Sequence, residues 1–92
     1  MRVLVRAFAR FREIAGEKTC LDLKEGSTLQ DLLKVISASH PELEGDLLGS
    51  DGSAGHGVTI LRNRKGIDHS DLDNTALEEG DEVALLPPFS GG

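Results

Sequence analysis

The stretch Ser27-Thr28-Leu29-Gln30-Asp31-Leu32-Leu33-Lys34-Val35-Ile36 decides the fold, because it is the one long helix that the sequence predicts. Its apolar residues recur at the spacing i, i+3, i+4 and i+7 and so form one helix face: Leu29, Leu32, Leu33 and Ile36. Ser27 lies three residues before Gln30, which is the spacing of a capping box. Pro41 ends the helix, because it lacks the N–H that the hydrogen-bond ladder needs, and a brief second helix is expected up to Leu48, with its apolar face capping the core.

Two strands are predicted before this helix. Residues 2–9 alternate, with Val3, Val5 and Ala7 on one face, as in a strand with one buried side. Thr19–Leu23 predicts a second strand with Leu21 and Leu23 inward. The segment between them, 11–16, reads as a helical turn that Gly16 ends. The short connection indicates an antiparallel pair.

Further strands are predicted after the helix. Residues 49–57 contain four glycines among small polar residues and predict an exposed, mobile loop rather than a linker between domains. Strands are then expected at 58–61, near Ile67 after a turn at 63–66, and at 82–86. Gly80 can take the positive φ that the turn before the last strand requires, and Val83 and Leu85 should point inward.

Strands on either side of one long helix predict an α+β fold, in which the helix covers one face of the sheet. The alternative is a ferredoxin-like sandwich, which is disfavoured because only one long helix is present. Residues 1–88 are expected to form a single domain. Pro87 and Pro88 end the last strand because neither donates an N–H, so 89–92 should leave the domain as a flexible arm.

Composition excludes several classes of partner. The chain of 92 residues has 10 basic and 16 acidic residues, a net charge of −6, and neither Trp nor Tyr, which argues against nucleic acid. Its single cysteine, Cys20, allows no internal disulfide and suits a reducing compartment. No segment approaches membrane-spanning length and no secretory signal is recognisable. We therefore expect a cytoplasmic protein that is a monomer when free.

The C-terminal stretch Pro87-Pro88-Phe89-Ser90-Gly91-Gly92 is the most informative for function. At average glycine usage, about one chain in two hundred would end in two glycines by chance. A frayed terminus is the competing interpretation, but a two-proline stop directly after a buried strand is unlike a disordered trailer. Two residues without Cβ can pass a narrow channel and approach a nucleotide closely. The pattern favours a tail whose carboxylate is activated in another protein's site.

On these residues the chain resembles the ubiquitin-like sulfur carriers and modifiers of β-grasp fold, which include the molybdopterin synthase small subunit and the small archaeal modifier proteins. The resemblance spans nearly the whole chain. Its most specific part runs from Leu77 to Gly92, and supporting parts are Phe8–Glu13 with Gly16, the helix start at 29–33, and Leu61-Arg62-Asn63. It implies a mixed sheet of four to five strands with one main helix on one face. Leu85-Leu86 and the long 49–57 loop depart from the family pattern.

The resemblance also implies a function. An E1-like enzyme would use ATP to adenylate Gly92, which then becomes a thiocarboxylate that carries sulfur for molybdopterin biosynthesis, or an amide to a target lysine. Gly91 would give clearance, with Ser90 and Phe89 lining the partner's groove. The protein would be a substrate and carrier, not an enzyme, with no bound cofactor, although it could act as the small subunit beside a molybdopterin synthase large subunit.

The same resemblance implies an exposed apolar patch on the open sheet face that docks the E1-like partner. Phe8 and Leu86 are the best candidates, Leu4 extends the patch, and Arg12 adds a polar contact. The alternative is that Phe8 and Leu86 pack beneath a loop or helix and that Arg12 is only solvated.

The remaining cysteine, histidine and acidic residues give less information about function. Cys20 reads as an ordinary thiol, and His40, His56 and His69 lack metal-ligand spacing and are expected to be solvated, so no metal site is predicted. The acidic residues at 68–74 read as a polar turn rather than a calcium loop.

The competing function is a β-grasp module that binds a partner non-covalently and never uses its terminus. A catalytic constellation is not recognisable.

Overall fold

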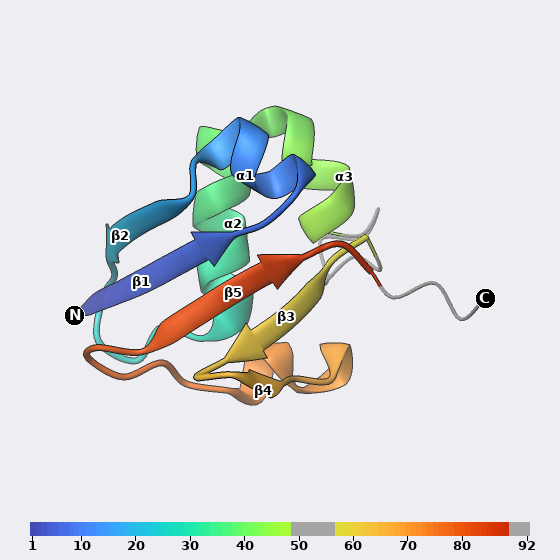
Figure 1. Cartoon of the computed structure of the whole chain (residues 1–92). Coiled ribbons are helices and arrows are strands. Elements are labelled where there is room, and N and C mark those ends of the chain that lie inside the picture. The colour runs from blue at the N-terminus through green and yellow to red at the C-terminus, as the bar shows by residue number, and fades with distance from the viewer. Residues whose placement is uncertain (49–56, 89–92) are drawn as a thin grey trace.

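The computed structural model describes residues 1–48 and 57–88 of the chain. Five strands form one sheet in the order β2-β1-β5-β3-β4. The helix α2 crosses one face of it, as Figure 1 shows. The elements, in chain order, are β1 Arg2–Ala7, α1 Arg10–Ala15, β2 Lys18–Asp22, α2 Leu29–Ser39, the 3-10 helix η1 Pro41–Leu43, α3 Glu44–Leu47, β3 Thr59–Arg62, β4 Lys65–Gly66, the 3-10 helix η2 His69–Asn74 and β5 Glu82–Leu86.

The sheet is mixed. β1 pairs with β2 antiparallel and with β5 parallel, and β3 pairs with β5 and β4 antiparallel. The antiparallel β1–β2 pair confirms the expectation from its short connection. The parallel pairing of the first and last strands comes from a contact between the two ends of the domain, and local patterning carries no sign of it. The β-grasp architecture predicted by resemblance is confirmed.

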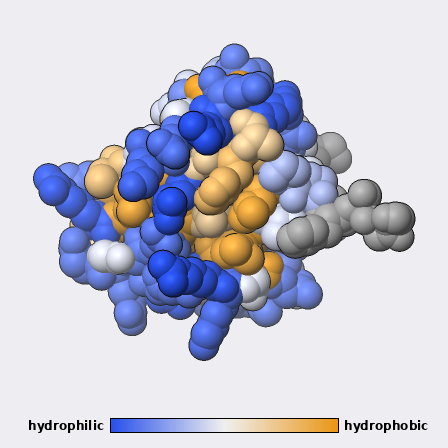
Figure 2. All heavy atoms as spheres, viewed as in Figure 1, coloured by the Kyte–Doolittle hydropathy of each residue, from blue (hydrophilic) through white to orange (hydrophobic). Residues whose placement is uncertain are grey.

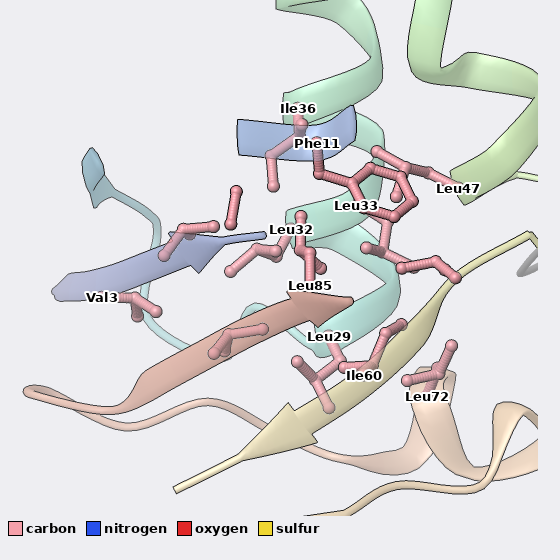
Figure 3. Packing of buried hydrophobic residues seen from close by; sticks show 14 of the residues in the cluster. Val3, Phe11, Leu29, Leu32, Leu33, Ile36, Leu47, Ile60, Leu72 and Leu85 are labelled. Atoms are coloured by element: carbon pink, nitrogen blue, oxygen red, sulfur yellow. The ribbon is translucent and has the colours of Figure 1, made fainter. Parts of the chain in front are cut away.

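The core forms between the sheet and the predicted face of α2. Leu29, Leu32 and Leu33 are completely buried, and Figure 3 shows the α2 side chains directed toward Leu85 of β5 and Ile60 of β3. The inward residues of β1 and β5, the first and last strands in the chain, are buried as predicted: Val3, Val5, Ala7, Val83 and Leu85. Burying these side chains supplies the main force that holds α2 on the sheet.

The start of α2 differs from the prediction. Thr28, not Ser27, is the N-cap: its Oγ1 accepts from the Asp31 N–H at 3.2 Å, and Asp31 Oδ2 accepts from the Thr28 N–H at 3.0 Å. The capping box therefore joins Thr28 and Asp31, one residue later than the predicted Ser27 and Gln30. An aspartate at the third position can return the backbone bond, as the motif requires.

Smaller differences occur elsewhere. β2 spans Lys18–Asp22, so the predicted inward Leu23 is buried but follows the strand, and Leu21 is only half-buried. The expected polar turn at 68–74 is the 3-10 helix η2, whose Leu72 is completely buried. The brief helix after Pro41 is confirmed as η1 and α3, with Leu43 and Leu47 in the core. The mobile loop predicted at 49–57 falls outside the described residues except for Gly57.

The turn before β5 confirms the role predicted for a glycine. Gly80 has φ +84, and its N–H donates to the Arg2 carbonyl at 2.8 Å. The turn thus closes against the start of β1. This bond helps to set β5 parallel to β1.

Candidate functional site

The tail that the sequence singles out begins where β5 ends. Leu86 is the last strand residue, and Pro87 and Pro88 follow it, both exposed. The predicted tail residues Phe89, Ser90, Gly91 and Gly92 lie outside the described residues. The described part therefore fixes the base of the tail: two residues without an N–H directly after a strand whose neighbours are β1 and β3.

The sheet face opposite α2 carries an apolar patch beside this base. Strand alternation places Phe8, Leu61, Ala84 and Leu86 on this face, because each of them lies next to a buried residue: Ala7, Ile60, Val83 or Leu85. Register brings them together: Leu61 pairs with Ala84 and the Phe8 N–H donates to the Leu85 carbonyl at 3.0 Å. Figure 2, which views this face, shows apolar atoms gathered over the middle of the sheet.

The structure brings together two of the four predicted patch residues. Phe8 is 37% exposed, and Leu86 is half-buried. Phe8 is therefore not packed beneath a loop or helix of the described residues, whereas Leu86 is only partly exposed. Leu4 pairs with Glu82. It precedes Phe8 by four residues, which is about 13 Å along a strand. It therefore lies apart from the other two.

A charged pair separates Leu4 from the patch. Arg6 Nη1 lies 3.6 Å from Glu82 Oε1, and the Arg6 guanidinium carbon is 6.0 Å from the centre of the Phe8 ring, within reach of a cation–π contact. Arg12 is exposed on α1 and lies 3.9 Å from Glu17, as a solvated side chain would. The Arg6–Glu82 pair therefore borders the patch, and Arg12 stands outside it.

Sequence reasoning missed Leu61 and Ala84 as patch residues. The signal was available in the alternation: Ile60, Val83 and Leu85 are inward, so Leu61 and Ala84 must face out. What the sequence lacked was the β3–β5 register that sets these two residues side by side.

A polar cluster locks the turn that leads into β5. Asp81 is only 6% exposed and accepts from the Glu78 N–H at 2.8 Å, from Arg62 Nε at 3.0 Å and from Asn63 Nδ2 at 3.1 Å. Burial raises the pKa of the Asp81 carboxyl, but these hydrogen bonds and the positive charge of Arg62 outweigh it and lower that pKa below its ordinary value. Asn63 also exchanges bonds with the Glu82 backbone.

Two stretches on which the family resemblance rests meet in this cluster. Leu61-Arg62-Asn63 supplies the donors, and the turn that begins at Leu77 supplies the acceptor at Asp81. These bonds hold the turn that leads into β5 and, through β5, the base of the tail.

The histidines and the cysteine differ in their surroundings. His69 is half-buried and its Nε2 donates to the Val58 carbonyl at 2.9 Å, so the expectation that it is solvated is wrong. His40 is half-buried, Cys20 is exposed, and His56 lies outside the described residues. Among residues 1–48 and 57–88, no group of His, Cys, Asp or Glu is placed to hold a metal ion.

Comparison with known proteins decides the family. The ThiS family profile matches residues 5–92, including the whole tail. The chain belongs to the ThiS family. Within it, the chain is 36% identical to small archaeal modifier protein 3 of Haloferax volcanii and 36% identical to the molybdopterin synthase sulfur carrier subunit of Chlamydomonas reinhardtii, each match covering 100% of both chains.

A ThiS-family fold is equally clear in three dimensions. The crystal structure of a small archaeal modifier protein from Haloferax volcanii superposes with a TM-score of 0.81 at 33% identity, covering 100% of both chains. Since these relatives are a protein modifier and a sulfur carrier, the resemblance predicted from the sequence is confirmed.

In the described part of the chain, no helix is long and apolar enough to span a membrane.

Proposed function

We propose that the Gly92 carboxylate is adenylated by an E1-like enzyme and then acts as a thiocarboxylate sulfur carrier, is conjugated to target lysines, or does both. The observation that carries the proposal is the Gly91-Gly92 ending, which the ThiS family match includes. The names of its relatives support both outcomes, because one is a modifier and another a sulfur carrier.

The chemistry follows from the carboxylate. It is a poor electrophile, and attack of its oxygen on the α-phosphate of ATP releases pyrophosphate and leaves an acyl-adenylate whose AMP is a good leaving group. Hydrosulfide then displaces AMP to give the thiocarboxylate, or a lysine amine displaces it, directly or through a thioester, to give an amide. Gly92 is therefore the substrate, and the partner supplies ATP and the catalytic groups.

The domain's part is to present the tail. Glycines at the end let the arm pass close to the nucleotide, and Pro87 and Pro88 pre-order its base, which reduces the entropy lost on threading. The patch of Phe8, Leu61, Ala84 and Leu86 is the surface we propose for docking the activating enzyme. An apolar centre bordered by the Arg6–Glu82 pair is typical of an interface core and rim.

Further partners belong to the same proposal. A thiocarboxylate is a soft nucleophile, which suits sulfur delivery to a pterin precursor in a complex with a molybdopterin synthase large subunit. Activation consumes ATP, which the cytoplasm supplies, and we propose that the protein works there. It binds no cofactor of its own.

Activation assays test the proposal directly. The full chain, its cognate E1-like enzyme and ATP should release pyrophosphate and give an adenylate in the mass spectrum. Deleting Gly91-Gly92 should abolish both signals without changing thermal unfolding. Gly45→Ala is a matched glycine control, since nothing lies within 4 Å of an added Cβ there, and it should be activated normally.

Absence of the adenylate with every cognate activating enzyme would favour the competing function, a module that binds without using its terminus. To separate the two outcomes of activation, the protein is isolated from its own cells. An isopeptide from Gly92 to foreign lysines indicates tagging, whereas a free thiocarboxylate and loss of molybdopterin on gene deletion indicate sulfur delivery.

A further inference from the structure

One edge of the sheet has a free strand. β2 is the outermost strand, and within the described residues no strand pairs with its outer side. It is exposed at four of its five positions. An unpaired edge offers a row of backbone N–H and C=O groups to another strand.

The β1–β2 register shows which backbone groups are free. The Leu23 N–H donates to the Met1 carbonyl at 2.8 Å, and the Ala7 N–H donates to the Glu17 carbonyl at 3.0 Å. In an antiparallel ladder, paired residues alternate between bonding toward one neighbour and the other. Residues 17, 19, 21 and 23 thus bond to β1, and Lys18, Cys20 and Asp22 direct their backbone groups outward.

The side chains of the free strand have a symmetric pattern. Cys20 is the central residue of β2, with Lys18 two residues before it and Asp22 two residues after it. When the strand pairs antiparallel with a second copy of itself about Cys20, Lys18 of one copy lies opposite Asp22 of the other, twice. Opposite charges in direct cross-strand pairs are stabilising, and like charges are destabilising.

The charges are available for this pairing. The Asp22 side chain is 85% exposed and lies 4.0 Å from the Met1 amino group, and Arg2 is its cross-strand neighbour on β1. Lys18 and Cys20 are also exposed. Charged side chains often protect a free edge from pairing with another strand. Protection from a second copy of β2 would need like charges opposite each other, whereas here Lys18 of one copy faces Asp22 of the other.

The other face of this edge is apolar. Leu21 and Thr19 pair with Val3 and Val5 of β1 and so face the α2 side, where they line an apolar groove with Val35. Val35 is 39% exposed, one of two large apolar side chains so exposed in the described residues, the other being Phe8 of the docking patch. A second β2 would extend the floor of this groove and shield it from water.

From these observations we infer that the chain forms a symmetric dimer by antiparallel β2–β2 pairing centred on Cys20. About six backbone hydrogen bonds join the two strands, and the sheet becomes continuous across both copies. The proposed dimer differs from the sequence-based expectation of a monomer, and the experiments below decide between the two. β1 lies between β2 and β5, so the strand that leads to Pro87 and Pro88 is not part of the pairing edge, and the inference does not rest on the proposed role of Gly92.

Charge reversal tests the register. The full chain is studied in reducing buffer by sedimentation velocity over a concentration series, where a dimer should grow with concentration. Lys18→Asp or Asp22→Lys should each raise the dissociation constant by about tenfold or more, because each places two like-charged pairs in the interface. The double variant Lys18→Asp with Asp22→Lys restores both pairs and should dimerise like the natural chain.

An equimolar mixture of the two single variants provides the decisive control. One has only acidic and the other only basic residues at these two positions, so a mixed dimer should form where neither variant alone dimerises. Circular dichroism of each variant checks that the fold is intact. Deleting Gly91-Gly92 should leave the dimer unchanged, which separates this test from that of the proposed function.

Cys20 reports the centre of the interface. Paired residues that exchange both backbone bonds have Cα atoms about 5.5 Å apart, within the range of a disulfide. Diamide should therefore oxidise the two Cys20 thiols to one disulfide, taking up two electrons and two protons, and a covalent dimer should appear. Lys18→Asp should slow this cross-linking, and Cys20→Ser should abolish it.

Three results would overturn the inference: a monomer at every concentration, a dimer whose dissociation constant is unchanged by both single variants, or a mixture that fails to form the mixed dimer. Edge pairing only with an unrelated extended peptide, without self-association, would also refute the choice of a second copy.

Discussion

Arg62 Nη2 lies 2.9 Å from Asp81 Oδ2, an ion pair that joins the end of β3 to the turn before β5. Asp81 is buried and Arg62 is about one-quarter exposed, so the carboxylate depends on its protein partners more than the guanidinium does. The pair is a structural link in the element that carries the tail.

Replacing Asp81 by Asn should lower the free energy of unfolding by about 2 kcal/mol, because hydrogen bonds to a buried charge are lost and an amide NH₂ must face donors from Arg62 or Asn63. Urea denaturation followed by circular dichroism measures it. Asp73→Asn, at an exposed position of η2, is the matched control and should change stability by no more than about 0.5 kcal/mol. Equal effects at the two sites would refute the structural role of Asp81.

The pH dependence of stability should change as well. The pKa of Asp81 is below its ordinary value of 3.8 in the fold, so the unfolded chain binds more protons there than the native state does. The stabilisation is therefore complete above the unfolded pKa and is lost as the pH falls through the folded pKa. Unfolding free energies measured from neutral pH downward should show an acid loss that is smaller in Asp81→Asn. Identical slopes would contradict this assignment.

Phe8→Ala should weaken binding to the activating enzyme by about tenfold, as expected for an aromatic residue in an interface core. Its own contribution to folding is small, since the side chain is over one-third exposed. Isothermal titration calorimetry with the enzyme measures the affinity. Val35→Ala removes a similarly exposed apolar side chain from α2 and should leave the affinity unchanged, and equal losses would place the docking surface elsewhere.

The position of the helix cap can be tested by two alanines. Thr28→Ala removes the hydroxyl that accepts from the Asp31 N–H and should cost about 1 kcal/mol of stability. Ser27→Ala, at the position favoured by the sequence spacing, should change stability by less than about 0.5 kcal/mol. Thermal and urea unfolding of both variants decide between the two caps, and a larger loss for Ser27→Ala would reverse the correction.

The backbone at Ala9 is strained, with φ 54 and ψ −128. Glycine adopts this conformation readily, whereas a residue with a Cβ does so at a cost of about 1–3 kcal/mol. Ala9→Gly should therefore raise the free energy of unfolding by about 1 kcal/mol, after the greater freedom of the unfolded chain is subtracted. The same change at Ala38, exposed in α2, should lower it by about 1 kcal/mol. A loss of stability at both sites would argue against strain at Ala9.

How far the fold could be predicted depended on how local each signal is. The spacing of Leu29, Leu32, Leu33 and Ile36 predicts α2, and the alternation at Val83 and Leu85 predicts the buried face of β5, because each pattern repeats within a few residues. The polar residues around Leu72 hid its burial, since one buried side chain in a short 3-10 helix sets up no period.

For the candidate site, the glycine ending and the outward position of Phe8 could be read from the chain. Leu61 and Ala84 could not be placed beside Phe8, nor Leu4 separated from it, until the register was known. The role of Arg62 and Asn63 was hidden for the same reason, since their partner Asp81 lies far along the chain.

The sequence by itself determined the main helix, the buried faces of the first and last strands, the family and the tail that ends in Gly92, because periodicity, turn chemistry and terminal composition are properties of neighbouring residues. Only the tertiary structure decided that β1 and β5 lie parallel, that the apolar patch sits beside the base of the tail, and that β2 has no outer partner among residues 1–48 and 57–88. These three features depend on which distant strands exchange backbone hydrogen bonds. Strand pairing is determined by burial of the shared core beneath α2, and no short stretch of the chain specifies it.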